Sequence, residues 1–180
     1  MDAPLNELAT AFAGAARAVH PDQLETRTPC EKFTVAELLG HLAGVLAGSE
    51  RAARKQPQTP ETTTAEPAAV ADLALKAAAA WAEPAAYEGM TAFGPGEMPA
   101  QFAAAITLQE LALHGWDLSR AIGRTFTVSE ETAEVTLAVV EQLAEQARAN
   151  GSYGPALEAS AGGPAFDRAL AASGRNPEWA

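Results

Sequence analysis

Cysteine is almost absent from this sequence, which has Cys30 as its one thiol among 180 residues. A single thiol can form neither an internal disulfide nor a multi-cysteine zinc site. We interpret Cys30 as a small buried hydrophobic residue rather than as a nucleophile. A disulfide-stabilised scaffold and a thiolate zinc cluster are therefore both excluded.

Long apolar runs are missing as well. No stretch approaches the roughly 20 residues that a helix needs to cross a bilayer. The N-terminal Met-Asp-Ala-Pro has no basic start leading into an apolar run, so it does not resemble a signal peptide. The sequence therefore predicts a soluble cytoplasmic protein.

Positive charge is scarce, with 12 lysines and arginines against 23 aspartates and glutamates and a formal net charge of -11. Phosphate backbones and anionic lipid surfaces repel such a chain. We therefore expect neither nucleic acid nor membrane as a partner, and expect a small-molecule substrate instead. Alanine-rich helix faces are also compatible with a homodimer.

Aromatic residues make up only 6% of the chain, and no segment has the enrichment in valine, isoleucine and threonine that is typical of strands. Hydrophobic residues nevertheless make up 48%, and many of them are alanine, which favours helices and lets them pack closely. The composition therefore predicts an all-α fold.

Helical periodicity and capping signals extend this prediction along the chain. Thr34 and Glu37 form a capping box, Thr127 and Glu130 are spaced for a second one, and Gly123 suits a C-terminal cap. The linker 56–60 and the glycine-rich segment 84–97 are predicted to be irregular, and we expect the latter to cover the site. The predicted helices span residues 5–19, 34–55, 67–83, 98–123, 127–149 and, as a short helix, 166–172.

We predict an antiparallel four-helix bundle within residues 1–150. Residues 151–180, which are rich in glycine and proline and hold the short helix, form a C-terminal extension that packs on the bundle. The length of 180 residues is typical of a single domain overall.

One stretch of the predicted fourth helix has the residue types of a metal site. Glu110, His114 and Asp117 are spaced by four and then three residues, which places them on one side of a helix. His41 lies at the edge of the apolar face of the second helix. Two imidazoles and one carboxylate, from His41, Glu110 and His114, are the three-ligand set typical of catalytic zinc, and they also suit iron or nickel.

Other interpretations of these residues remain open. His41 is also explained as a partly buried histidine bonded to a backbone carbonyl, and Glu110 with His114 as a one-turn ion pair. Asp117 would orient an imidazole or be a ligand itself. His20, beside a proline at a helix end, is interpreted as a capping or surface residue.

Three stretches resemble one known family. TPCEKFTVAELLGHL (28–42), HGWDLSRAIG (114–123) and SGRNPEW (173–179) resemble motifs of actinobacterial proteins in the DinB/YfiT-like superfamily. This superfamily includes the metal-binding domain of mycothiol-dependent maleylpyruvate isomerase. The sequence departs from the pattern at Phe33, where the family commonly has tryptophan, and the substitution keeps an apolar anchor.

The resemblance implies a four-helix bundle that binds a divalent metal through His41, Glu110 and His114, with mycothiol or a similar thiol as the second cofactor. The isomerase has an additional C-terminal domain with no counterpart in this sequence, so its specific reaction is not carried over. Trp116 is expected in the core, and Arg120 is expected either to pair with Asp117 or to contact substrate.

These observations lead to three hypotheses of function. The first is a metal-dependent enzyme, a thiol S-transferase or isomerase, in which zinc, nickel or iron activates a low-molecular-weight thiol for attack on an electrophile. The second is a metal-binding or small-ligand-binding bundle without catalysis. The third is a structural or dimerisation module, in which the same residues form only a hydrogen-bonded cluster.

Overall fold

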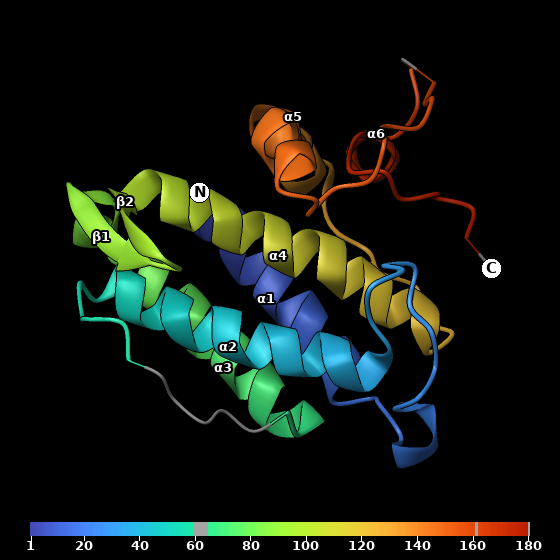
Figure 1. Ribbon diagram of the computed structural model, residues 1–180, viewed down its shortest axis with the longest axis horizontal. Coiled ribbons are helices and arrows are strands. Elements are labelled where there is room, and N and C mark those ends of the chain that lie inside the picture. Colours follow the sequence, from blue (N-terminus) through green and yellow to red (C-terminus); the bar gives the residue numbers. More distant parts are fainter. Residues whose placement is uncertain (60–64, 161, 180) are drawn as a thin grey trace.

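The computed structural model describes residues 1–59, 65–160 and 162–179, and it is mainly helical (Figure 1). Its α-helices are α1 (Asp2–Ala16), α2 (Val35–Ala53), α3 (Pro67–Trp81), α4 (Ala100–Ala121), α5 (Glu130–Ala149) and α6 (Ala165–Ala172). The remaining elements are the 3-10 helices η1 (Pro21–Gln23) and η2 (Pro84–Tyr87) and the strands β1 (Met90–Phe93) and β2 (Gly96–Pro99). No helix in the described ranges is both long enough and apolar enough to cross a membrane.

Helices α1 to α4 form the bundle around the main core. Both α1 and α2 pack against α3 and α4, so that α1 and α2 occupy opposite corners (Figure 1). The core between them consists largely of leucine and alanine, with Trp81 as its largest fully buried side chain. Small alanine side chains let the helix backbones approach closely, as the composition indicates.

A hydrogen-bonded polar cluster lies within this core. The Trp81 indole donates to Ser49 Oγ at 2.9 Å, and Ser49 Oγ lies 2.7 Å from Thr107 Oγ1. All three side chains are fully buried, and together they link α3, α2 and α4. Because an unpaired buried hydroxyl is unfavourable, the cluster favours one arrangement of these helices.

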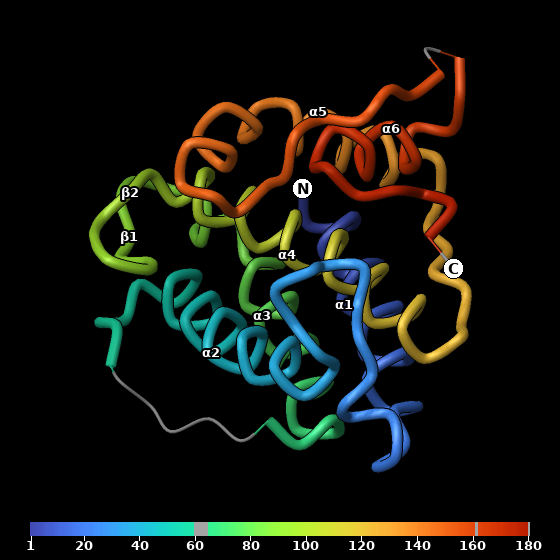
Figure 2. The backbone as a smooth tube through the Cα atoms, turned by 45° about the vertical axis from the view of Figure 1, so that its right-hand side comes forward, coloured from blue at the N-terminus to red at the C-terminus, as the bar shows by residue number. Residues whose placement is uncertain are grey.

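Helices α5 and α6 form a separate layer on the side of α4 that faces away from α2 (Figure 2). A second apolar cluster, which includes Leu113, Trp116, Tyr153 and Leu170, joins this layer to α4. The burial of Trp116 confirms its predicted core position. Segment 151–179 thus packs against α4 and α5, and α4 is covered by protein on both sides.

The observed helix caps agree with the predicted ones at two helices and differ at a third. The Thr34–Glu37 capping box is present, with Glu37 N–H donating to Thr34 Oγ1 at 3.3 Å, and Gly123 follows α4 with a φ of 72°. The predicted cap of α5 is wrong. Ser129, rather than Thr127, caps this helix, and its N–H also donates to Glu7 Oε1 at 2.6 Å. A contact between segments this distant in sequence leaves no local signal.

Segment 84–97 corrects the prediction of an all-α fold, because η2 and an antiparallel hairpin replace the expected irregular segment. Phe93 pairs with Gly96 across a two-residue turn in which Gly94 has a φ of 60°. A positive φ at the first turn position favours glycine and is typical of a type II′ turn. The strands are too short and too poor in β-branched residues to be indicated by composition. Of the predicted linker 56–60, Pro60 lies outside the described residues.

A buried ion pair fixes the C-terminal segment to α4. Arg175 Nε donates to Asp117 Oδ1 at 2.9 Å, and its Nη2 donates to Asp117 Oδ2 at 2.8 Å. Asp117 is fully buried and Arg175 is 7% exposed. The predicted pairing of Arg120 with Asp117 is therefore wrong. Arg120 instead donates to the backbone carbonyl of Trp179, because the buried carboxylate is already satisfied by the tail.

We predict that Arg175→Met lowers the free energy of unfolding by about 3–5 kcal/mol, because it leaves the Asp117 carboxylate buried without its countercharge. The double variant Arg175→Met/Asp117→Leu should recover most of this loss, since both charges are then gone. Urea denaturation followed by circular dichroism measures both effects.

The exposed pair of Arg17 and Asp72, at 2.6 Å, provides a matched control. Arg17→Met should lower the free energy of unfolding by at most about 1 kcal/mol, because water already solvates both groups. Equal losses in Arg17→Met and Arg175→Met would contradict a buried-charge origin for the stability of the tail.

Candidate metal centre

The three side chains predicted as ligands lie together where α2 packs against α4. His41 comes from α2, and Glu110 and His114 lie one turn apart on α4. Glu110 Oε2 lies 2.9 Å from His41 Nε2 and 3.5 Å from His114 Nε2. One donor atom from each residue falls within 4.8 Å of the others. A carboxylate oxygen and two imidazole nitrogens therefore face one point.

The charge of Glu110 decides how these atoms interact. Burial raises the pKa of Glu110, but the hydrogen bond from His41 and the positive charge of His114 and His41 outweigh it, so the pKa is lowered overall. Glu110 is therefore ionised at neutral pH and can only accept hydrogen bonds. His41 Nε2 therefore donates in their 2.9 Å contact, and this proton would have to move to Nδ1 before Nε2 could bind a metal.

His114 is held from its other side by Asp117. Burial raises the pKa of Asp117, yet the Arg175 charge and the hydrogen bonds from His114 and Arg175 lower it overall. The ionised carboxylate accepts from His114 Nδ1 at 2.7 Å. In a neutral imidazole this leaves a lone pair on Nε2, directed at the carboxylate of Glu110. Two acceptors facing each other repel unless a proton or a metal cation lies between them, so the donor set fits a cation at this position.

Two successive hydrogen bonds, from Tyr153 through Gln109, hold Glu110. Tyr153 donates its hydroxyl proton to Gln109 Oε1, and Gln109 Nε2 donates to Glu110 Oε1 at 3.2 Å. Burial raises the pKa of Tyr153, so its hydroxyl stays protonated and able to donate. The carboxylate is thereby oriented with Oε2 toward the two imidazoles.

Phe33 covers the two histidines. Its ring stacks on His41 with centroids 5.1 Å apart, and it meets His114 edge-on at 6.0 Å. His41 nevertheless keeps 31% of its side-chain surface exposed, whereas His114 keeps 11%. The centre is therefore shielded by an aromatic ring on one side and reachable from another.

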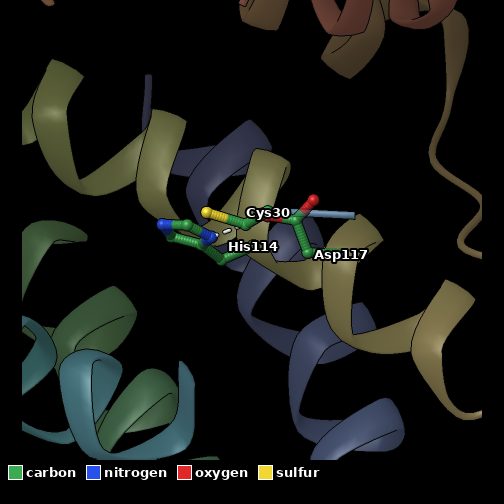
Figure 3. A group of neighbouring side chains, drawn as sticks. All are labelled: Cys30, His114 and Asp117. Carbon is green, nitrogen blue, oxygen red and sulfur yellow. Dashed lines mark hydrogen bonds and ion pairs between the residues drawn. The ribbon is translucent and has the colours of Figure 1, made fainter. Parts of the chain in front are cut away.

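Cys30 approaches His114 and Asp117 from the loop before α2 (Figure 3). This second group is a poor metal site, because both oxygens of Asp117 already accept from Arg175 and one accepts from His114 as well. Burial and the charge of Asp117 raise the pKa of Cys30 and keep its thiol protonated. Cys30 is half-buried rather than fully buried as predicted, and its protonated thiol still favours a small hydrophobic residue over a ligand or nucleophile.

Two hollows meet at Glu110. The larger, about 650 Å³, lies between α2, the hairpin and α4, and the smaller, about 140 Å³, lies between α4 and α5. Segment 84–97 was predicted to cover the site, and the structure places Phe93, Gly94 and Pro95 in one wall of the larger hollow. His20 is exposed beside η1 and belongs to neither hollow.

The sequence patterns did not find Tyr153, Gln109 or Arg175 as supports of the centre. Arg175 lies in the stretch SGRNPEW (173–179), which resembles the C-terminal motif of the family, but that resemblance did not indicate which residue Arg175 contacts. Tyr153 and Gln109 carry no comparable signal, because their contact joins positions 44 residues apart.

Comparison with known proteins identifies the family of the chain. Two uncharacterized proteins of Mycobacterium tuberculosis, from strains CDC 1551 and H37Rv, are each 32% identical to the chain over 136 residues. The alignment covers 74% of this chain and 73% of each relative. No solved structure matches the chain. Residues 5–119 match the family described as the mycothiol maleylpyruvate isomerase N-terminal domain, and the chain belongs to this family.

Proposed function

We propose that the protein is a cytoplasmic, divalent-metal-dependent enzyme that uses a low-molecular-weight thiol such as mycothiol, as an S-transferase or an isomerase. His41, Glu110 and His114 are the proposed ligands, and zinc is the first choice of metal, before nickel and iron. The proposal rests on one observation. The Nε2 atoms of His41 and His114 both lie close to the ionised carboxylate of Glu110.

The state of Asp117 supports catalysis over a purely structural metal site. Structural zinc sites generally have four protein ligands, whereas catalytic sites keep an open position for water or substrate. Asp117 would be the fourth ligand, but Arg175 and His114 Nδ1 already occupy its two oxygens. Three protein ligands therefore remain, the number typical of catalytic zinc sites.

A divalent cation held by these residues would supply Lewis acidity that lowers the pKa of a thiol presented to it. The protein's own residues prepare the position. Asp117 keeps the His114 proton on Nδ1, so that Nε2 offers its lone pair. Gln109 orients Glu110, and Phe33 limits the access of water to both imidazoles.

The thiol is the nucleophile in this proposal, because Cys30 is protonated and lies on the Asp117 side of His114. Glu110 borders both hollows, so two reactants have separate approaches to the centre. The family name joins mycothiol to maleylpyruvate isomerase, and it supports the thiol without fixing the electrophile.

Metal content is the first test. We expect about one zinc, nickel or iron ion per chain, as for a mononuclear site, in protein purified without chelator or histidine tag, loaded with divalent ions and desalted. His41→Ala/His114→Ala should lose the ion, because one carboxylate is left to bind it. Elemental analysis measures the ratio of metal to protein.

His20→Ala is the matched control, since it removes the third histidine of the chain from an exposed position. It should leave the metal content unchanged. Metal retained by the double variant, or absent from the loaded wild type, would refute the proposed ligands.

Turnover of thiol and electrophile tests the reaction. Metal-loaded wild type mixed with mycothiol or a bacillithiol-like thiol and a panel of electrophiles should accelerate the loss of free thiol if it is a transferase. If it is an isomerase, the thiol is regenerated, and chromatography should instead show the electrophile converted to its isomer. His41→Ala/His114→Ala should return the rate to that of the uncatalysed mixture, because the Lewis acid is absent. If a metal-binding wild type accelerates no member of the panel while the site is loaded, the non-catalytic metal-binding hypothesis replaces the enzyme.

Asp117→Asn tests the orientation of His114. The uncharged amide holds the imidazole N–H more weakly than the carboxylate, so metal affinity should fall by about 10–100-fold. Competition with a chromophoric chelator measures the affinity, and circular dichroism checks that the variant is folded. Tyr153→Phe removes only the hydroxyl that donates to Gln109, so it should lower the metal affinity less than Asp117→Asn does. Unchanged affinity in folded Asp117→Asn would show that the contact does not position the ligand.

A further inference from the structure

The hollow between α2, the hairpin and α4 has the size of a small-molecule site. Its volume of about 650 Å³ lies within the range of roughly 300–1,000 Å³ common for ligand pockets. Glu110 forms part of its wall, so a molecule bound there reaches the proposed metal centre. The residues that line this hollow indicate which class of molecule it can bind.

The α2 wall of the hollow includes two glycines. Gly44 and Gly48 lie one turn apart and both line the hollow. An added Cβ at Gly44 would meet no atom within 4 Å, whereas at Gly48 it would meet Gln58 Oε1 at 3.0 Å and Phe93 Cε2 at 3.5 Å. The absence of a side chain at Gly44 thus leaves this part of the hollow open.

The side chains that border the hollow are mainly apolar. Val45 contributes one from α2, and Phe93, Met98 and Ile106 supply most of the others from the hairpin and α4. Such a surface favours a ligand that buries hydrocarbon.

Polar groups in the hollow are few. Both amide protons of Gln58 are used, donated to the carbonyls of Gly48 at 3.0 Å and Ala92 at 2.8 Å. The Glu110 carboxylate is the one charged group among the described lining residues, and none of these residues is basic. A carboxylate-bearing ligand would therefore find no basic side chain in the wall, and in the proposed enzyme the excess positive charge of the metal would already be neutralised by the thiolate.

We propose that this hollow binds the electrophilic substrate, and that this substrate is an uncharged molecule with an apolar, aromatic or alkyl body. The assignment rests on the proposed function, because the reacting end of the molecule would lie at Glu110. It differs from the acidic substrate in the family name. The smaller hollow, at about 140 Å³, lies below the range common for ligand pockets, and both polar and apolar residues line it.

The test uses N-phenyl-1-naphthylamine, a neutral apolar dye whose fluorescence rises on burial. Wild-type protein should bind it, and Gly44→Leu should weaken binding by about tenfold or more, because a leucine there occupies apolar contact space. Side chains on a helix lean toward its N-terminus, so this leucine leans toward His41. Unchanged dye affinity in Gly44→Leu would overturn the assignment.

Gly40→Leu is the matched control. Gly40 is one turn earlier on α2, is exposed, and would also accept a Cβ without meeting an atom within 4 Å. Both variants gain the same helix propensity, but leucine at 40 leans away from the hollow. Dye affinity should therefore match that of wild type, and an equal loss in both variants would overturn the assignment.

Competition on the wild-type protein tests the chemical class without any variant. Naphthalene-2-carboxamide and naphthalene-2-carboxylate share a shape and differ in charge. The neutral amide should displace the dye at about tenfold lower concentration, a difference of about 1.4 kcal/mol. Equal displacement by the carboxylate would overturn the uncharged class.

Metal content, measured on the same samples, separates the two proposals. Gly44→Leu should keep its metal, because the glycine is no ligand. Metal binding without dye binding would overturn the substrate assignment alone. Dye binding that Gly44→Leu abolishes, in a protein that takes up no metal, would support the hollow as a neutral-ligand site and overturn its role as the electrophile site of a metalloenzyme.

Discussion

The buried pair of Asp117 and Arg175 is the interaction on which the site and the outer layer both depend. A carboxylate inside a protein is stable only when it is paired and hydrogen-bonded, and Arg175 provides both. The same carboxylate fixes the proton of His114 on Nδ1. The packing of the tail on α4 and the direction of the His114 lone pair are therefore set by one group.

The C-terminal segment reaches the proposed ligands twice. Arg175 acts on His114 through Asp117, and Tyr153 acts on Glu110 through Gln109. Both supporting side chains lie beyond residue 119, where the family match ends. The matched region thus holds the three donors, whereas this chain's tail supplies the groups that orient two of them. The geometry of the proposed ligands in this chain therefore depends on what packs behind α4 as well as on α4 itself.

Sequence patterns predicted those features that depend on residues a few positions apart. The capping box at Thr34 and the glycine after α4 follow from residues a few positions apart, and so does the common face of Glu110 and His114. The approach of His41 required the packing of α2 on α4, which the bundle prediction and the family resemblance both implied. The hairpin, the cap at Ser129 and the partner of Asp117 were missed. The cap at Ser129 is local, since its hydroxyl accepts from Thr132 N–H, but Thr127 offered a competing signal two residues earlier and the contacts of Glu7 with Ser129 come from a distant segment. Arg175 is also distant from Asp117 in sequence, so periodicity does not indicate their pairing.

Charge within the centre connects the proposed metal to the proposed substrate. Glu110 and Asp117 are ionised and Arg175 is the one cation among the five clustered side chains, so with neutral imidazoles the cluster has one negative charge in excess. A divalent cation would reverse this to one positive charge in excess, which a single anion neutralises. The apolar hollow has no basic group among its described lining to bring in a second anion. The anionic partner is then the thiol, and the molecule that it attacks enters uncharged.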